Sequence, residues 1–316
     1  MARPLRPSPN SAARQRSAPL LAVILLGATL AGAAPSPGSL NRLTTEERTS
    51  GWEFLFDGVA AECWRGINGS PFPSGYWELR GRCLKTEPAL IGRDLVSRDE
   101  FENFEFAFDW RLPSGGNSGV KYLVDESHEH PYAFEIRVGL ALFCAILLIG
   151  LVLIRILVWN RRRAFLGVRP QTLSTVLGVL GLAMGVLAAE VLDRLEHQST
   201  GLEIQLLSND RHRDSKTPSR RAGALYDRIA PESSPVKPPG EWNTGRVKVD
   251  GLRVEHWING DRVVSYEIGS DDMRRRIESS KFRGLSGFGA KAGRHIVLQH
   301  HQDEVCFRNL RIRRLP

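Results

Sequence analysis

Cysteine is scarce in this chain, and the few cysteines are not spaced as metal ligands. The four cysteines are Cys63, Cys83, Cys144 and Cys306. Their spacing excludes a zinc ribbon or a small disulfide framework. A bridge between Cys63 and Cys83 is open to the chain in an oxidising compartment, but an isolated buried thiol is the expected state of each cysteine.

The chain also lacks a basic stripe with interleaved aromatic residues. Its formal net charge is +8, but the excess is mostly Arg and is spread over an N-terminal arm, a loop between two apolar segments and scattered positions. Proteins that bind nucleic acid concentrate their basic residues on one face, so nucleic acid is not expected as a partner. Once export and apolar segments are set aside, the 316 residues leave one domain with a full core.

The clearest strand pattern spans residues 104–124. Every second residue over 104–112 is large and apolar, which predicts a half-buried strand. A glycine-rich turn over 113–119 interrupts the pattern before it resumes. Because glycine permits close backbone approaches, Asn117 and Ser118 are candidates for substrate contacts at the rim of a sheet. The alternative is a plain connector with two solvated polar residues.

The second half of the chain is also rich in strand patterns. Residues 202–207 place apolar side chains on one face and Glu203 and Gln205 on the other. Residues 246–268 predict three strands joined by Asp-Gly and Asn-Gly turns, and residues 294–313 predict a final hairpin. Many short strands without intervening helices favour a mainly β fold, an antiparallel β-sandwich.

The N-terminal residues have the pattern of an export signal. Arginines precede the apolar run over 20–30, and small residues follow it. We therefore interpret residues 1–34 as a signal peptide or N-terminal anchor and residues 35–50 as a linker.

Two further apolar segments lie in the middle of the chain. They predict a transmembrane α-hairpin inserted over residues 131–198, and the arginines between them predict a cytoplasmic loop. Residues 51–130 and 199–316 would then be the two halves of one sandwich, held at a membrane on its periplasmic or outer side. The alternative is a buried helical hairpin in the core of a soluble protein.

Nine short motifs of the two strand-rich halves carry a resemblance. In chain order they are WEFLFDG (52–58), GGNSG (115–119), EIQ (203–205), AGALYD (222–227), KPPGEWN (237–243), VEHWING (254–260), SKF (280–282), LQ (298–299) and FRN (307–309). In this order they resemble the 3-keto-disaccharide hydrolase family, a group of 3-keto-glucoside lyase or hydratase-like domains. The match covers residues 51–126 and 200–315.

The resemblance implies a concanavalin-like jelly-roll sandwich that acts on glycosides oxidised at sugar carbon 3. The family pattern has Asp where Ser208 stands, and it has Asp and Gly where His300 and Gln302 flank His301. A membrane hairpin is not part of that pattern.

The implied chemistry needs a base and a group that stabilises an oxyanion. A ketone at carbon 3 acidifies the proton at carbon 2, so a base can remove it while the group on carbon 1 leaves. A Glu or His suits the base, and Lys, amide donors or a cation suit the oxyanion. Strand alternation groups Glu203 with Gln205 and Gln299 with His301, and these four are the catalytic candidates. For His301, a hydrogen-bonded rim position is the alternative.

Further candidates are less specific. Lys121 and Glu255 join Asn117 and Ser118 as substrate-binding candidates. Trp257 could stack on a sugar face, or else pack within the sandwich.

A divalent metal ion is a further candidate cofactor, with ligands that the sequence leaves open. Glu126, His128 and His130 alternate in one loop, and Glu203 or Asp210 could add oxygen ligands. The alternative for the loop triplet is plain exposure to solvent.

Three functions stay open from the sequence. The ordered motifs favour an extracytoplasmic, membrane-anchored enzyme that cleaves 3-keto-glycosides by elimination or hydration. The departures at three positions favour a carbohydrate-binding module without catalysis, because a fold does not settle a function. The apolar hairpin favours a membrane-tethered interaction domain.

Overall fold

The computed structural model describes residues 40–89, 92–127, 133–161, 170–197, 200–285, 287–291 and 293–316. The predicted signal segment lies outside these residues, and so does the start of the predicted linker. The rest of that linker contains a short helix, α1 (Thr45–Thr49), whose first turn is capped by the Thr44 hydroxyl, which accepts a hydrogen bond from Glu47 N.

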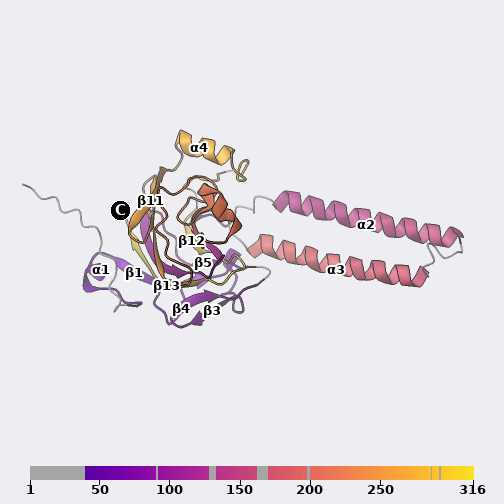
Figure 1. Cartoon of the computed structure of the whole chain (residues 1–316), viewed down its shortest axis with the longest axis horizontal. Coiled ribbons are helices and arrows are strands. Elements are labelled where there is room, and N and C mark those ends of the chain that lie inside the picture. The colour runs from indigo at the N-terminus through magenta and orange to yellow at the C-terminus, as the bar shows by residue number, and fades with distance from the viewer. Residues whose placement is uncertain are drawn as a thin grey trace, which may run out of the picture. The chain divides into compact units, whose positions relative to one another are not determined.

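The described strands form two antiparallel sheets (Figure 1). In spatial order, the eight-stranded sheet contains β11 (Asp261–Glu267), β10 (Arg253–Ile258), β9 (Asn243–Asp250), β6 (Phe104–Arg111), β13 (Cys306–Arg314), β4 (Cys83–Thr86) and β3 (Trp77–Arg80), with β1 (Trp52–Phe56) also paired to β13. The five-stranded sheet contains β2 (Trp64–Arg65), β5 (Leu95–Ser97), β12 (His295–Leu298), β7 (Asn117–Val124) and β8 (Leu202–Leu207).

Both sheets mix strands from the two ends of the sequence. In the larger sheet β6 lies between β9 and β13, and in the smaller sheet β7 lies between β12 and β8. Neither half of the chain therefore holds a complete sheet of its own, and the strands of both halves share one core.

That core follows from the alternation of the strands. The four aromatic side chains of β6, Phe104, Phe106, Phe108 and Trp110, are at most 2% exposed. They belong to one apolar cluster with residues from beyond position 200, such as Val247. Each such buried side chain stabilises the fold by about 1.5–3 kcal/mol relative to exposure.

The turns of the second half explain its hairpins. Gly251 has φ +60° in the β9–β10 turn, and Asn259 and Gly260 have φ +50° and +94° in the β10–β11 turn. Positive φ at such positions is what Asp-Gly and Asn-Gly turns supply, so the three predicted strands are confirmed.

The predicted final hairpin is wrong. β12 belongs to the five-stranded sheet and β13 to the eight-stranded sheet. The connection between them crosses from one layer of the sandwich to the other and contains Gln302, which has φ +71°. Alternation predicted both strands but could not tell that they lie in different sheets.

The two apolar segments form long helices, α2 (Ala133–Arg161) and α3 (Pro170–His197), which lie side by side (Figure 1). Within the described ranges, however, no helix is long and apolar enough to cross a membrane. The predicted transmembrane hairpin is therefore corrected to a helical hairpin. On α2, Arg137 and Arg155 confine the uncharged run to residues 138–154, short of the roughly 20 residues that a typical span needs.

Short helices occupy the remaining connections. They are α4 (Asp271–Glu278) and the 3-10 turns η1 (Ile67–Gly69), η2 (Arg213–Lys216) and η3 (Pro218–Arg220). The four cysteines are free thiols, so the structure contains no Cys63–Cys83 bridge.

Candidate active site

The candidate site lies on the face of the five-stranded sheet that is turned away from the other sheet. On β7 and β8 the core side chains are Val120, Tyr122, Leu202, Ile204 and Leu206. The intervening residues point the other way, and the strand register sets Lys121 directly opposite Glu203 and Gly119 opposite Gln205. Directly opposed residues have Cβ atoms about 5 Å apart, so Lys121 and Glu203 are neighbours on this polar face.

Glu203 occupies space that only a glycine leaves open. A Cβ at Gly119 would lie 2.1 Å from Glu203 Oε1, and the Glu203 residue is 7% exposed. Burial raises the pKa of the Glu203 carboxyl above its ordinary value, and the charges of Lys121 and Lys281 partly oppose that rise. A carboxylate with a raised pKa is a better base near neutral pH.

Three amide side chains lie beside Glu203 on the same face. Gln205 Nε2 donates to Asn117 Oδ1 at 3.0 Å, and both residues are at most 2% exposed. Gln299 follows β12 and donates its backbone N–H to the Gly119 carbonyl at 2.9 Å. Its side-chain Oε1 is buried and accepts no hydrogen bond within the described residues. A buried acceptor without a donor is costly, and a ligand hydroxyl would satisfy it.

Lys121 is held by a buried ion pair. Its Nζ donates to Asp94 Oδ2 at 2.8 Å, and the two side chains are 6% and 0% exposed. The other Asp94 oxygen accepts the backbone N–H of His300 at 3.0 Å. Asp94 therefore fixes the position of the Lys121 ammonium group next to Glu203.

The structure adds residues that the sequence reasoning did not select. Lys281 Nζ lies 4.7 Å from the ring centre of Tyr226; burial lowers the pKa of Lys281, and the nearby Glu203 charge raises it. Burial likewise raises the pKa of Tyr226, with Glu203 as the next cause. Lys281 lies within the family-like motif SKF and Tyr226 within AGALYD, so these motifs were the sequence signal that could have identified the two residues. They sit on loops, where no alternation assigns a face.

Arg228 is a second addition. It is 5% exposed, and its guanidinium lies 4.1 Å from the Phe282 ring centre and 4.4 Å from that of Phe288. Burial lowers its pKa to about 10, and its Nε and Nη2 have no hydrogen-bond partner within the described residues. With Lys121 and Lys281, it adds positive potential around Glu203.

Three of the sequence candidates, Ser118, Glu255 and Trp257, lie elsewhere, and His301 lies in a loop. Ser118 is fully buried on the core side, where its hydroxyl donates to the Gln299 carbonyl at 2.8 Å. Glu255 and Trp257 lie on β10 of the other sheet, where Trp257 Nε1 donates to Glu255 Oε2 at 3.3 Å. His301 follows the end of β12 at Leu298 and is half-buried, so the expected alternation from Gln299 does not extend to it as a strand.

The metal hypothesis gains no support from the described residues. Within them, no group of three or more His, Cys, Asp or Glu side chains could hold a metal ion. Glu126 instead accepts two hydrogen bonds from Arg65, at 2.9 and 2.6 Å, while His128 and His130 lie outside the described residues. Asp210 accepts hydrogen bonds from Ser114 and Ser208, at 2.5 and 2.6 Å.

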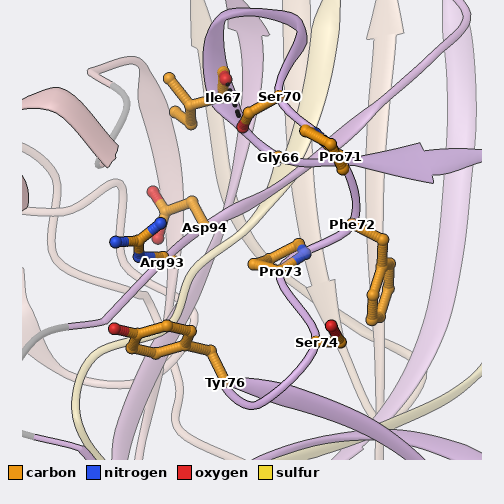
Figure 2. A pocket seen from close by; sticks show the side chains of 10 residues that line it. All are labelled: Gly66, Ile67, Ser70, Pro71, Phe72, Pro73, Ser74, Tyr76, Arg93 and Asp94. Atoms are coloured by element: carbon orange, nitrogen blue, oxygen red, sulfur yellow. Dashed lines mark hydrogen bonds between the residues drawn. The ribbon is translucent and has the colours of Figure 1, made fainter.

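A cavity of about 210 Å³ lies beside Asp94 (Figure 2). Its walls come from the connection over residues 66–76 and from Arg93 and Asp94. Because Asp94 also holds Lys121, the cavity adjoins the polar face that carries Glu203.

Comparisons with known proteins identify relatives of this chain. The model of the 3-keto-alpha-glucoside-1,2-lyase-like domain matches residues 51–140 and 185–313. A 3-keto-disaccharide hydrolase of Bacteroides thetaiotaomicron is 25% identical over 283 residues, which cover 83% of this chain and 78% of the relative. The crystal structure of a candidate glycosyl hydrolase from Parabacteroides distasonis superposes with a TM-score of 0.61 at 24% identity, covering 88% of this chain and all of that one. This last likeness supports the antiparallel sandwich fold.

Proposed function

Because the chain belongs to the family of 3-keto-alpha-glucoside-1,2-lyase-like domains, we propose that it is an enzyme that cleaves glycosides oxidised at carbon 3 of the sugar. The relative from Bacteroides thetaiotaomicron is named for the same kind of substrate. The observation that carries the proposal is the buried Glu203 carboxylate with Lys121 directly opposite it.

The proposed reaction starts at carbon 2 of the oxidised ring. Glu203 takes the carbon 2 proton, which the neighbouring ketone acidifies, and the electron pair moves onto the carbon 3 oxygen as an enolate. When the ketone re-forms, a double bond forms between carbons 1 and 2 and the bond from carbon 1 to the leaving oxygen breaks. That oxygen takes a proton from water. The hydroxide that this leaves adds to carbon 1, and return of the Glu203 proton to carbon 2 gives the free 3-keto sugar.

The surrounding side chains suit the charge that develops in this reaction. The enolate carries a negative charge, and the ammonium groups of Lys121 and Lys281, whose charges act on the Glu203 carboxyl, would stabilise it. Asp94 holds Lys121 in place through the ion pair at 2.8 Å. The amides of Asn117 and Gln205, already joined to each other, would orient the sugar hydroxyls.

The variant Glu203→Gln tests the proposal. It keeps the size and hydrogen-bonding capacity of the side chain but removes the base, so turnover of a 3-keto-glucoside should fall by about two orders of magnitude or more. Exchange of the carbon 2 proton in D₂O, followed by NMR, should fall in parallel. Glu53→Gln, an exposed glutamate on β1 of the other sheet, is the matched control and should retain both activities.

The assay also separates the proposal from the alternatives. Saturable sugar binding without turnover by the wild-type protein would indicate a carbohydrate-binding module. Unchanged turnover in a folded Glu203→Gln variant would place the base elsewhere, with His301 the next residue to test.

We further propose that the enzyme acts outside the cytoplasm, on the basis of the signal-like sequence over residues 1–34. A reporter enzyme that is active only after export, fused after residue 50, should be active. Equal reporter activity after deletion of residues 1–34 would contradict an exported location that depends on this segment.

A further inference from the structure

The cavity in Figure 2 opens next to the reacting groups. Asp94 lines the cavity, and its Oδ2 accepts the hydrogen bond from Lys121 Nζ at 2.8 Å. Lys121 in turn is the strand partner of Glu203. Asp94 and Lys121 therefore link the cavity to the base that we propose, as expected if adjacent rings of one substrate occupy the cavity and the site of the base.

The walls of the cavity combine apolar surfaces with charged groups. Figure 2 shows Arg93, Asp94 and Tyr76 grouped beside Pro73, and Phe72 contributes a second ring. The Arg93 guanidinium lies 4.9 Å from the ring centre of Tyr76. A pyranose has an apolar face of C–H groups and an edge of hydroxyls, and an aromatic ring beside a guanidinium and a carboxylate matches both.

Backbone hydrogen bonds hold the wall in its observed shape. Gly66 N donates to the Ser70 carbonyl at 2.9 Å, and Tyr76 N donates to the Pro73 carbonyl at 3.1 Å. Glu126 Oε1 accepts the backbone N–H of Asn68 at 2.6 Å. A wall that is already ordered loses little conformational freedom when a ligand binds.

Behind this wall, the buried His300 supports it. The His300 ring meets the Tyr76 ring edge-on, with 6.2 Å between their centres. Its Nε2 lies 2.9 Å from the Glu87 carbonyl oxygen, which fixes the imidazole. One of the departures from the family pattern therefore packs against the cavity wall.

The size of the cavity limits what it can hold. At about 210 Å³ it is smaller than pockets for drug-sized ligands, which start near 300 Å³, so it has room for about one ring. We propose that this cavity is the subsite for the sugar ring that leaves from carbon 1, and that this ring is an unoxidised pyranose. The inference rests on the proposed function for the reaction, but it assigns the cavity a ligand that can be tested without turnover.

The first test measures binding of methyl glucoside, an unoxidised pyranose, by saturation-transfer NMR. Ser74→Phe places a ring in the cavity from an exposed position and should weaken binding at least tenfold. Ser233→Phe, an exposed serine outside the cavity, is the matched control and should bind as the wild type does. Glu203→Gln should also keep its binding, because it leaves the cavity intact. Equal binding by the Ser74→Phe and Ser233→Phe variants, or no saturable binding by the wild type, overturns the assignment.

The second test compares two substrates that differ in the leaving group. Tyr76→Ala should raise KM for a 3-keto-disaccharide about three- to tenfold, the range for loss of one ring contact, with kcat unchanged. It should leave the 3-keto methyl glucoside unaffected, since methanol does not fill the cavity. Trp52→Ala removes an aromatic ring that lies 5.3 Å from the Arg313 guanidinium on the other sheet, and it should change neither substrate.

The two tests fail in distinguishable ways. Equal losses on both substrates in the Tyr76→Ala variant would overturn the subsite while leaving the proposed function intact. If the wild-type protein cleaves neither substrate, the proposed function fails, and the methyl glucoside measurement still decides whether the cavity binds a pyranose.

Discussion

The Tyr122 hydroxyl lies 2.6 Å from His256 Nε2, so a hydrogen bond joins β7 of one sheet to β10 of the other in the middle of the apolar core. His256 Nδ1 lies 3.1 Å from the Gly223 carbonyl oxygen. A carbonyl oxygen can only accept, so Nδ1 carries the proton and Nε2 accepts from Tyr122. The network therefore needs a neutral imidazole. The Tyr266 hydroxyl extends it, at 2.8 Å from that of Tyr122.

The neutral His256 predicts a loss of stability in acid. Burial lowers its pKa from 6.5 to about 4. Between those values the unfolded chain binds a proton that the folded chain does not, so the free energy of unfolding falls as the pH drops from about 6.5 to about 4. We expect a loss of roughly 3 kcal/mol over this window. Urea unfolding at a series of pH values between 7 and 4 measures it.

The matched variant for this prediction is His256→Gln, which has an amide in place of the imidazole and does not titrate. Nearby charged or titratable groups, Arg228, Tyr122 and Tyr266, keep their charge state across this pH range and are common to both proteins. The variant should start less stable at pH 7 and lose less stability in acid. Parallel curves of stability against pH for the two proteins would contradict the assignment to His256.

A second prediction concerns Gly119, whose missing side chain makes room for Glu203. In Gly119→Ala the added Cβ would lie 2.1 Å from Glu203 Oε1, so the carboxylate must move. Because the carboxylate is the end of a flexible side chain, stability should fall by only about 1 kcal/mol. Displacement of a reacting group by about 1 Å can cost about a hundredfold in rate, so kcat should fall to that extent.

The control for this prediction is Gly245→Ala in the other sheet, where a Cβ would lie 2.4 Å from Phe108 Cε2. This clash is with a core ring, so the variant should lose stability but keep its kcat per folded molecule. A Gly119→Ala protein with wild-type kcat would show that the observed place of the Glu203 carboxylate does not matter for turnover.

Part of this site was predictable because the period of a strand is fixed by its backbone. Alternation put Glu203 and Gln205 on one face, opposite the apolar residues that do pack in the core. The same rule could not exclude Glu255 and Trp257, since alternation assigns a face of a strand but not the sheet to which the strand belongs. Lys121 and Glu203 face each other because of a strand register that joins residues far apart in the sequence. No local sequence pattern predicts such a register.

Other parts of the site had no periodic signal. Lys281 and Tyr226 lie on loops, and their positions depend on how those loops pack over the sheet. Asp94 precedes a strand of only three residues, β5, too short for a reliable pattern. Composition also predicted only part of the apolar segments' structure. It predicted their helices correctly, but the membrane span that was inferred from the same composition found no support among the described residues.

A third prediction uses the departure at Gln302, where the family pattern has Gly. Gln302 has φ +71°, in the region that costs a residue with a side chain roughly 1 kcal/mol or more and costs glycine little. Gln302→Gly should therefore raise the free energy of unfolding by about 0.5–1 kcal/mol. Gln302→Ala is the control, because it removes the side chain yet keeps the Cβ, and it should give no such gain in urea unfolding. Equal stability of the two variants would show that the backbone conformation carries no cost.

The last prediction is that the sandwich folds without its helical hairpin. Tyr122 of β7 and Leu202 of β8 are direct partners in the sheet register, although α2 and α3 lie between them in the sequence. A short linker with an Asn-Gly turn can join neighbouring antiparallel strands, so replacing residues 131–198 should leave both sheets intact. Closing a much shorter loop costs less entropy, so stability should stay equal or rise by up to about 2 kcal/mol.

The same replacement removes large exposed apolar side chains, among them Ile146 at 68% and Leu182 at 72%. Such surface promotes association, so the shortened protein should be monomeric at concentrations where the full chain self-associates. Circular dichroism, urea unfolding and light scattering after gel filtration measure these outcomes, with turnover as the check on the site. If the shortened chain stays unfolded, the prediction is wrong. β7 and β8 would then pair only when α2 and α3 are present, and the two helices would be needed to stabilise the sandwich.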